Sequence, residues 1–502
     1  MSKRNITVPP LYVQRYDFFK KFAICCFIVF IAFNGLGYLF YKDDLQNNPT
    51  GLLDEQCNDD HLTTPLLSYT KVKVNDTKAA NTDITDANVL PENNDILSSY
   101  INTNNTKEKL SKRDKEINKK YCGKPNCKFL FAYYLPEQET KANANYRSFV
   151  TLAEKLDRIM VLTNVGNSRI NSCQNLTFDF YYDVDELKKM YPDVKFITQQ
   201  DFRDWSRERH KKPNTEHAYI LPGDRNSTVE LVNPYPDQLK EGFCLNLFDF
   251  NLNDKTIFKQ FHTGAKFYRE IKTHQMFSDL LVNNLITNVD VLLASHLIFH
   301  PLFPEIAPPI PYAKHFLEES KRVSTKLHPY IAVHWRMERA TLSLLKECST
   351  RLVEKIKDIS LMYGIKNVYL ATDYPLTGGA QSSTFDLLTD LHHDAIRYLN
   401  SSVNVDNWVT MDVFGDLRKN KTFDSEFSGA GMPGIVDKLI CINSKFFLAT
   451  PEGCGRQQST FTTMIIDQRN ETLLNLDNIT NIKDDNNDID NDNILNVVER
   501  WM

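Results

Sequence analysis

Hydrophobic residues in the C-terminal half of the chain recur in two alternating patterns, short apolar runs and longer helical stretches. The apolar runs, typical of buried strands, cover Tyr330–Val333, Asn367–Asp373, Trp408–Asp412 and Lys445–Ala449. Apolar residues three and four positions apart predict helices over about 345–359 and 384–399, and over Ile435–Ile442 and Ser459–Asp467. Strands that alternate with helices favour a parallel sheet in an α/β domain.

The region from residue 121 to about 310 shows a similar alternation. Strands are predicted at Lys128–Leu135, Arg158–Thr163, Phe178–Tyr182 and Val194–Ile197. Helical patterns cover Ala142–Leu156 and about 255–297, whereas about 205–255 has no sustained period. The proline-rich stretch Pro301–Pro311 is typical of a connection between domains. We therefore predict two Rossmann-like domains, residues 121–310 and 311–474, with a site in the cleft between them.

Residues 22–41 form a nearly uncharged apolar stretch of about 20 residues, enough to span a bilayer as a helix. Basic residues precede this stretch, and Asp43 and Asp44 follow it closely. The positive-inside rule then places residues 1–21 in the cytosol and the rest of the chain on the far side. Without a clear cleavage site of small residues, an uncleaved signal-anchor is favoured over a signal peptide. The expected location is the ER or Golgi membrane, in a single-pass type II orientation.

Two further segments are predicted to be disordered, because they are rich in polar residues and lack a sustained period. Residues 42–120 carry Asn, Asp, Thr and Lys and are interpreted as a stem that holds the domains away from the membrane. Residues 475–502 are interpreted as an acidic, mostly disordered tail.

Composition agrees with a lumenal, globular protein. The 59 Lys and Arg residues nearly balance the 64 Asp and Glu residues, which argues against a general nucleic-acid binder. Of the 10 cysteines, Cys25 and Cys26 lie in the apolar stretch, and the other cysteines are even in number, which favours disulfides in an oxidising compartment. Cys122 and Cys127 are close enough to close a small loop, but spacing does not fix the remaining pairs. Asn-x-Ser/Thr triplets occur at Asn75, Asn104, Asn175, Asn226, Asn400, Asn420, Asn470 and Asn478.

Charged side chains cluster where the predicted strand Tyr330–Val333 ends. His334, Arg336, Glu338 and Arg339 follow this strand. Ligands of open α/β sheets bind beyond the carboxyl ends of the strands, and a guanidinium group matches phosphate or carboxylate oxygens. The sequence therefore predicts an anion site at this strand end. Glu338 and Arg339 can either belong to that site or only hold the strand end in place.

A second feature of this kind is the loop Pro451–Thr462, between a predicted strand and a predicted helix. It contains Arg456, and Ser459 is placed to cap the helix, whose first turn offers backbone N–H groups to a phosphate. An ordinary strand-to-helix turn is the alternative. Asp373 ends its own strand at the same predicted edge, where it can bind a ligand or cap the following turn.

Several short segments occur in a fixed order over roughly residues 125–472. They are Pro136–Ala142, Phe178–Leu187, Ile197–Phe202, Tyr330–Arg339 with its His-x-Arg core, Val368–Asp373, and Ile435–Cys441 followed by Ser459–Phe461. Together these segments resemble the motifs of the GDP-fucose protein O-fucosyltransferase family. The resemblance implies a GT-B fold, two Rossmann-like domains facing across a cleft, with GDP-fucose as donor, inversion at the anomeric carbon, and no metal or other cofactor.

The resemblance also assigns roles to individual residues. It implies that Arg336 contacts the β-phosphate and the glycosidic oxygen. His334 and Asp373 would contact the guanosine part, and the phosphate and nucleotide pocket would be lined by Ser459, Thr460 and Phe461. From its place in the loop Pro451–Thr462, Arg456 is a further candidate for binding the substrate.

The loop Pro136–Lys141 departs from the Gly-Arg-x-Gly-Asn-Gln loop of many family members and is closer to a branch whose Pro-Glu-Gly loop supplies the base. Glu137 is therefore the candidate general base and Glu139 the reserve, unless both are solvated loop carboxylates. Asp183-Val-Asp185 matches the metal motif of other glycosyltransferases, but the residues after it favour the start of a helix.

The sequence thus predicts an inverting, metal-independent fucosyltransferase that uses GDP-fucose and a protein Ser/Thr or glycan acceptor. One alternative is the same fold with another nucleotide sugar, and a second is a non-catalytic lumenal protein that binds nucleotide sugars or glycans. A sulfotransferase is disfavoured, because no glycine-rich loop with a basic residue clearly follows Leu135.

Overall fold

The computed structural model describes residues 110–500, with internal gaps. The residues outside this description are 1–109, 224–225, 233–244, 246–248, 253–256, 265, 268, 299, 305–307, 378–384, 386, 428–430, 457–458, 481–496 and 501–502. The predicted membrane span, residues 22–41, and most of the predicted stem therefore lie outside the described residues. Within the described part, no helix is long and apolar enough to cross a membrane.

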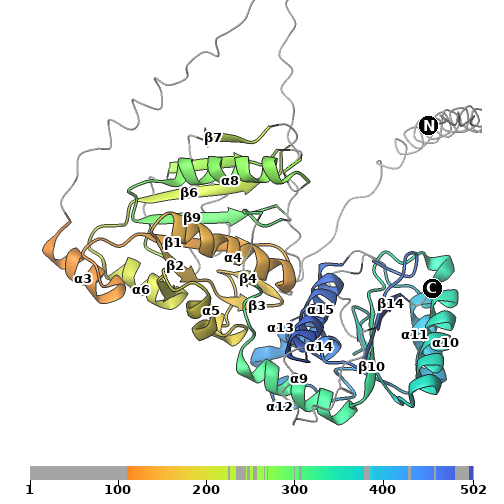
Figure 1. Ribbon diagram of the computed structural model, residues 1–502. Helices are drawn as coiled ribbons and strands as arrows, with labels where there is room; N and C mark the ends of the chain where they lie inside the picture. The colour runs from red at the N-terminus through yellow and green to blue at the C-terminus, as the bar shows by residue number, and fades with distance from the viewer. Residues whose placement is uncertain are drawn as a thin grey trace, which may run out of the picture. The chain divides into compact units, whose positions relative to one another are not determined.

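Strands of the N-terminal half form one mixed sheet, nine-stranded over the described residues, in the order β3-β4-β1-β9-β6-β8-β7, with β2 paired to β1 and β5 (Figure 1). The run β5-β2-β1-β9-β6-β8 is parallel, whereas β4, β3 and β7 are joined by antiparallel pairing. The strands are β1 (Phe129–Leu135), β2 (Ile159–Leu162), β3 (Val165–Gly166), β4 (Arg169–Asn171), β5 (Phe196–Thr198), β6 (Thr215–Leu221), β7 (Thr228–Val232), β8 (Ile257–His262) and β9 (Val291–His296).

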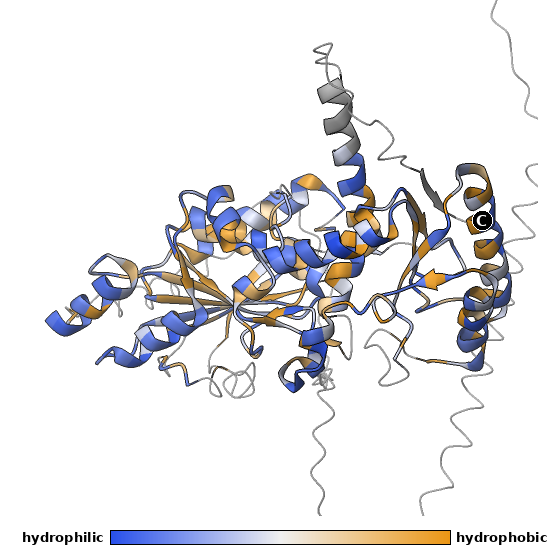
Figure 2. Cartoon of the chain, turned by 90° about the horizontal axis from the view of Figure 1, so that it is seen from below, coloured by the Kyte–Doolittle hydropathy of each residue, from blue (hydrophilic) through white to orange (hydrophobic). Residues whose placement is uncertain are grey.

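Helices connect these strands and cover the sheet, and their outward faces are hydrophilic while the strands are mostly apolar (Figure 2). They are α3 (Lys112–Cys122), α4 (Glu139–Lys155), α5 (Val184–Met190), α6 (Gln199–Glu208) and α8 (Ile271–Leu285). The helix α4 buries Tyr146, Phe149 and Leu152 in the core, as the spacing of its apolar residues predicted.

The C-terminal half contains a parallel sheet in the order β12-β11-β10-β13-β14. Its strands are β10 (Tyr330–Trp335), β11 (Asn367–Thr372), β12 (Val405–Asp406), β13 (Phe446–Ala449) and β14 (Val497–Arg500). Its helices are α9 (Lys314–Leu327), α10 (Leu345–Tyr363), α11 (Asp390–Ser402), α12 (Gly415–Arg418), α13 (Asp424–Phe427), α14 (Met432–Ile442) and α15 (Thr460–Thr480). The predicted α/β alternation is therefore present in both halves.

Alternation along β10 places its side chains in two separate cores. Ile331, Val333 and Trp335 pack with α10 and α11, whereas Tyr330 and Ala332 pack on the face that α14 and α15 cover (Figure 1). Because β10, β11 and β13 are parallel neighbours, their carboxyl ends lie at the same edge of the sheet. That edge carries the predicted site.

Two predicted strands are wrong. Phe178–Phe180 is a 3-10 helix, and Phe178, Tyr181 and Tyr182 are buried in the core at a spacing of three and four residues. Trp408–Asp412 forms turns, because the Asn407 side chain accepts hydrogen bonds from the backbone N–H groups of Val409 and Thr410. Such side-chain bonds compete with a strand ladder.

The other differences lie in connecting and terminal regions. The predicted helical region 255–297 also contains the strands β8 and β9, and the unassigned region 205–255 contains β6 and β7. The helix predicted from 384 begins at Asp390. Part of the predicted tail is ordered, since α15 continues to Thr480 and β14 pairs with β13.

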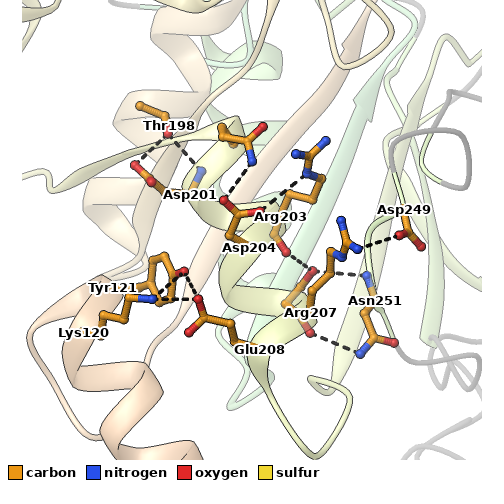
Figure 3. A network of polar contacts seen from close by, with 12 residues as sticks. Lys120, Tyr121, Thr198, Asp201, Arg203, Asp204, Arg207, Glu208, Asp249 and Asn251 are labelled. Atoms are coloured by element: carbon orange, nitrogen blue, oxygen red, sulfur yellow. Dashed lines mark hydrogen bonds and ion pairs between the residues drawn. The ribbon is translucent and has the colours of Figure 1, made fainter.

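The helix α3 contradicts the predicted disorder at the end of the stem. Ser111 caps this helix by accepting from the N–H group of Asp114, and the disulfide Cys122–Cys127 follows it. Near its end, Lys120 and Tyr121 both bind the Glu208 carboxylate of α6 (Figure 3). Residues 112–120 therefore belong to the folded part of the chain.

The basic run Arg203–Lys212 is only partly a solvated face. Arg207 forms an ion pair of 3.4 Å with Asp249 (Figure 3). Arg209 has a fully buried side chain that pairs with Asp290 at 3.3 Å. These pairs connect α6 to neighbouring segments of the fold.

Arg469 is a buried cation that holds the end of α14. Its Nη1 atom donates to the carbonyl oxygens of Cys441, Ile442 and Ser444, which are groups that a helix end leaves without intrahelical partners.

We expect Arg469→Leu to lower the free energy of unfolding by about 3 kcal/mol, because the carbonyl groups lose charge-assisted hydrogen bonds. Urea denaturation measures this change. Arg397→Leu, at an exposed arginine of α11, is the control, and a loss no larger than in that variant would contradict the role of Arg469.

Candidate active site

A cleft of about 660 Å³ lies between segments of the two halves. One wall comes from the loop after β1 and the start of α4, and the other from the carboxyl edge of the smaller sheet and the start of α14. Its lining includes most of the predicted site residues, namely Glu137, Glu139, His334, Arg336, Glu338, Arg339, Asp373, Arg456, Thr460 and Phe461. The fold thus brings together predicted site residues that lie more than three hundred positions apart in the sequence.

Arg336 is held on two sides at the end of β10. Its Nη1 atom donates to the Ser459 hydroxyl at 3.1 Å, and its Nε atom lies 2.7 Å from the Glu338 carboxylate. The backbone N–H of Arg336 donates to Thr450. These contacts fix the guanidinium group at the cleft, where a phosphate can approach it.

The loop after β13 approaches the Arg336 backbone very closely. The Arg456 N–H donates to the Arg336 carbonyl, and a Cβ atom on Gly455 would lie 1.9 Å from that oxygen. Only glycine fits at this position. The loop is fixed further by a Cys348–Cys454 disulfide and by the Trp335 indole, which donates to the Cys454 carbonyl. Trp335 therefore supports the loop after β13 from the side away from the cleft.

Asp373 has the capping role that the sequence left open. Its two carboxylate oxygens accept from the backbone N–H groups of Met337 and Glu338, at 2.7 and 3.1 Å. Burial of the carboxyl group raises the pKa of Asp373 to about 7. Asp373 also lines the cleft, but its hydrogen bonds hold the turn that follows β10.

The rings of His334 and Phe461 pack against each other at the cleft, with a tilt of 31° between their planes. Their ring centroids are 4.6 Å apart, and the His334 Nδ1 atom is 2.8 Å from the Thr462 hydroxyl. Burial lowers the pKa of His334 to about 3, and the nearby Arg336 charge acts in the same direction. The imidazole is therefore neutral at physiological pH and can stack against a planar base.

Ser459 occupies the predicted position just before α15. The Thr463 N–H donates to the Ser459 carbonyl, the first bond of the helical ladder, while the Ser459 hydroxyl accepts from Arg336. The exposed Thr460 lies in the first turn and lines the cleft. The first turn of α15, whose N–H groups have no partners within the helix, and a fixed guanidinium group thus occupy one end of the site.

The structure separates the two candidate bases. Glu137 lines the cleft with a partly exposed carboxylate, and Lys141 is 3.3 Å from it. Glu139 is buried and engaged by the Tyr182 and Tyr312 hydroxyls and by the Lys438 ammonium group. A carboxylate with three partners cannot readily accept a proton from a substrate, so Glu137 is the better candidate.

Asp183 serves as a helix cap, as predicted. Its carboxylate accepts from the N–H groups of Asp185 and Glu186 at the start of α5. No group of three or more potential metal ligands occurs among the residues that the structure describes.

Comparisons with solved structures find fucosyltransferases. POFUT1 in complex with GDP-fucose is similar with a TM-score of 0.40 and 13% identity, over 70% of this chain and 96% of that chain. The apo form of POFUT1 gives a TM-score of 0.39 and 13% identity, over 69% and 95%. NodZ alpha-1,6-fucosyltransferase co-crystallized with GDP gives 0.33 and 11%, over 68% and 92%. No protein-family model and no curated protein matches the sequence.

These structures belong to the class of enzyme that the sequence motifs resemble. Because their TM-scores are below 0.5, the function proposed below rests on the residues of the cleft.

Sequence reasoning missed two buried groups on α14. Asp437 lines the cleft and accepts from the Tyr369 hydroxyl at 2.5 Å, and burial raises the pKa of Asp437 to about 7. Lys438 binds Glu139 and the Tyr312 hydroxyl, and burial lowers its pKa. The signal available was an Asp-Lys pair within an otherwise apolar helix, where charged residues are rarely buried without a partner or a role.

Proposed function

We propose that this protein is an inverting glycosyltransferase that transfers fucose from GDP-fucose to a hydroxyl group of a protein or glycan, without a metal ion. The observation that carries the proposal is the arrangement of the cleft. A fixed arginine and a helix start form one end, and a carboxylate from the other half of the chain faces the same space.

The cationic end suits the diphosphate of a nucleotide sugar. When the sugar departs, negative charge develops on the β-phosphate. Arg336, with Arg456 and the first turn of α15 beside it, would stabilise that charge in place before the reaction starts. Preorganised electrostatic stabilisation of this kind is usually the largest contribution to catalysis.

The base of the nucleotide would bind between the aromatic surface and the α14 carboxylate. His334 and Phe461 offer a face for stacking. Guanine presents neighbouring N–H donors, which a carboxylate such as Asp437 can accept. The location of Asp437 in the cleft therefore favours GDP over nucleotides that lack these donors.

Glu137 would act as the general base on the acceptor side. It would take the proton of the acceptor hydroxyl while that oxygen bonds to the anomeric carbon. The bond from this carbon to the β-phosphate oxygen breaks, and its electron pair remains on the phosphate beside Arg336. Attack from the face opposite the leaving group inverts the configuration.

Thermal stabilisation of the full-length protein by nucleotides tests this function. We expect GDP to raise the melting temperature more than UDP or ADP, because only guanine provides the paired donors. Transfer assays with GDP-fucose, GDP-mannose and UDP sugars then separate the proposed donor from another nucleotide sugar. Absence of stabilisation by GDP would contradict the proposal, and GDP binding without turnover would support a non-catalytic binding protein.

The cellular location is proposed from the sequence. Residues 22–41 would anchor the protein in the ER or Golgi membrane with the catalytic part in the lumen. Protease protection of the region after residue 41 in sealed microsomes measures this orientation, and digestion without detergent would contradict it.

A further inference from the structure

Glu338 is an almost fully buried carboxylate placed between two arginines of the cleft. Its Oε1 atom lies 2.7 Å from the Nε atom of Arg336 and 3.0 Å from an Nη1 atom of Arg456. The residue is only 6% exposed. One oxygen of Glu338 is therefore shared by two guanidinium groups from separate segments, the end of β10 and the loop after β13.

The backbone at Glu338 is fixed independently of its side chain. The N–H group of Glu338 donates to Asp373, and the neighbouring Met337 N–H does the same. Arg339, the next residue, has a φ of 61° in the left-handed region, which makes a tight turn in the chain. A rigid turn thus positions the Glu338 carboxylate beside the two arginines.

We propose that Glu338 is a positioning residue, which holds Arg336 and Arg456 together in the free enzyme and competes with the donor diphosphate for them. This inference rests on the proposed function, because it requires a diphosphate at these arginines. Two neighbouring guanidinium groups without an anion between them would repel each other, and the Glu338 carboxylate removes that repulsion. An incoming diphosphate must then share the arginines with a resident negative charge.

This arrangement is expected to lower the affinity of the cleft for diphosphates. The Glu338 charge lies close to the place where the phosphates would bind, so it weakens the binding of donor and of the GDP product alike. Arg336 gains a fixed orientation in return, because Ser459 and Glu338 hold it on two sides. Weaker product binding and a fixed arginine both favour turnover.

Neutral substitutions at Glu338 test the competition. Calorimetric titration of the full-length protein with GDP and with inorganic pyrophosphate is expected to show binding tighter by on the order of tenfold in both Glu338→Gln and Glu338→Ala. Guanosine, which has no phosphate, is expected to bind these variants and the wild type equally. Glu338→Ala should also lower kcat for transfer, with most of this loss restored in Glu338→Gln, whose amide oxygen can still accept from Arg456.

Glu452→Gln is the matched control, since it removes one negative charge from an exposed position in the same loop as Arg456. It is expected to bind pyrophosphate as the wild type does. Unchanged or weaker pyrophosphate binding in both folded Glu338 variants would overturn the inference while leaving the proposed function intact. Failure of the wild-type protein to bind GDP would overturn both.

Discussion

Replacement of Arg336 by alanine is expected to lower kcat for fucose transfer by about 10²–10³-fold, by analogy with the loss of one oxyanion-hole donor. The guanidinium group lies at the cleft with its position fixed by Ser459 and Glu338, so it can meet charge that develops on a leaving diphosphate. Steady-state kinetics with GDP-fucose and a competent acceptor measure the effect.

The loss should appear mainly in kcat, because the interaction strengthens as the leaving group gains charge. Arg351→Ala provides a control at an exposed arginine of α10 that does not line the cleft. A folded Arg336→Ala variant with the kcat of the wild type would contradict the proposed role of this residue.

Replacement of Glu137 by glutamine is expected to lower the rate of transfer by about 10²–10⁴-fold, the usual contribution of a general base. The amide keeps the size of the side chain but cannot take the acceptor proton. GDP binding should stay unchanged, since Glu137 comes from the loop after β1 and not from the donor end of the cleft.

Transfer kinetics and GDP titration of the same preparation separate these two effects. Glu154→Gln, at an exposed position of α4, the helix that follows the Glu137 loop, controls for the loss of a carboxylate. Normal transfer by Glu137→Gln would mean that another group accepts the proton.

The donor end of the cleft was predictable from the sequence because its signals are local. The apolar runs of β10, β11 and β13 identify three strands, and parallel pairing places their carboxyl ends at one edge. Arg336 and Asp373 follow β10 and β11 directly, and the loop after β13 leads to Ser459 at the start of α15, so the three converge. Their individual partners were not predictable, and Asp373 proved to hold a turn.

Other features depend on contacts between distant parts of the chain, which a sequence pattern does not show. The exclusion of Glu139 as a base depends on Lys438, which is 299 positions away. The buried position of Asp437 depends on Tyr369, 68 positions away. The prediction of a strand at Trp408–Asp412 was wrong because the Asn407 side chain accepts backbone hydrogen bonds that a strand would need for its ladder.

The Cys348–Cys454 bond links the start of α10 to the loop that carries Arg456. The same loop is also held to the end of β10 by hydrogen bonds from the Trp335 indole and the Arg456 N–H and by the contact of Arg456 with Glu338. The disulfide therefore adds a covalent link between α10 and the donor end of the cleft. In the oxidising lumen proposed for this protein the bond would form as the chain folds, whereas a reducing compartment would leave the loop that carries Arg456 without this link.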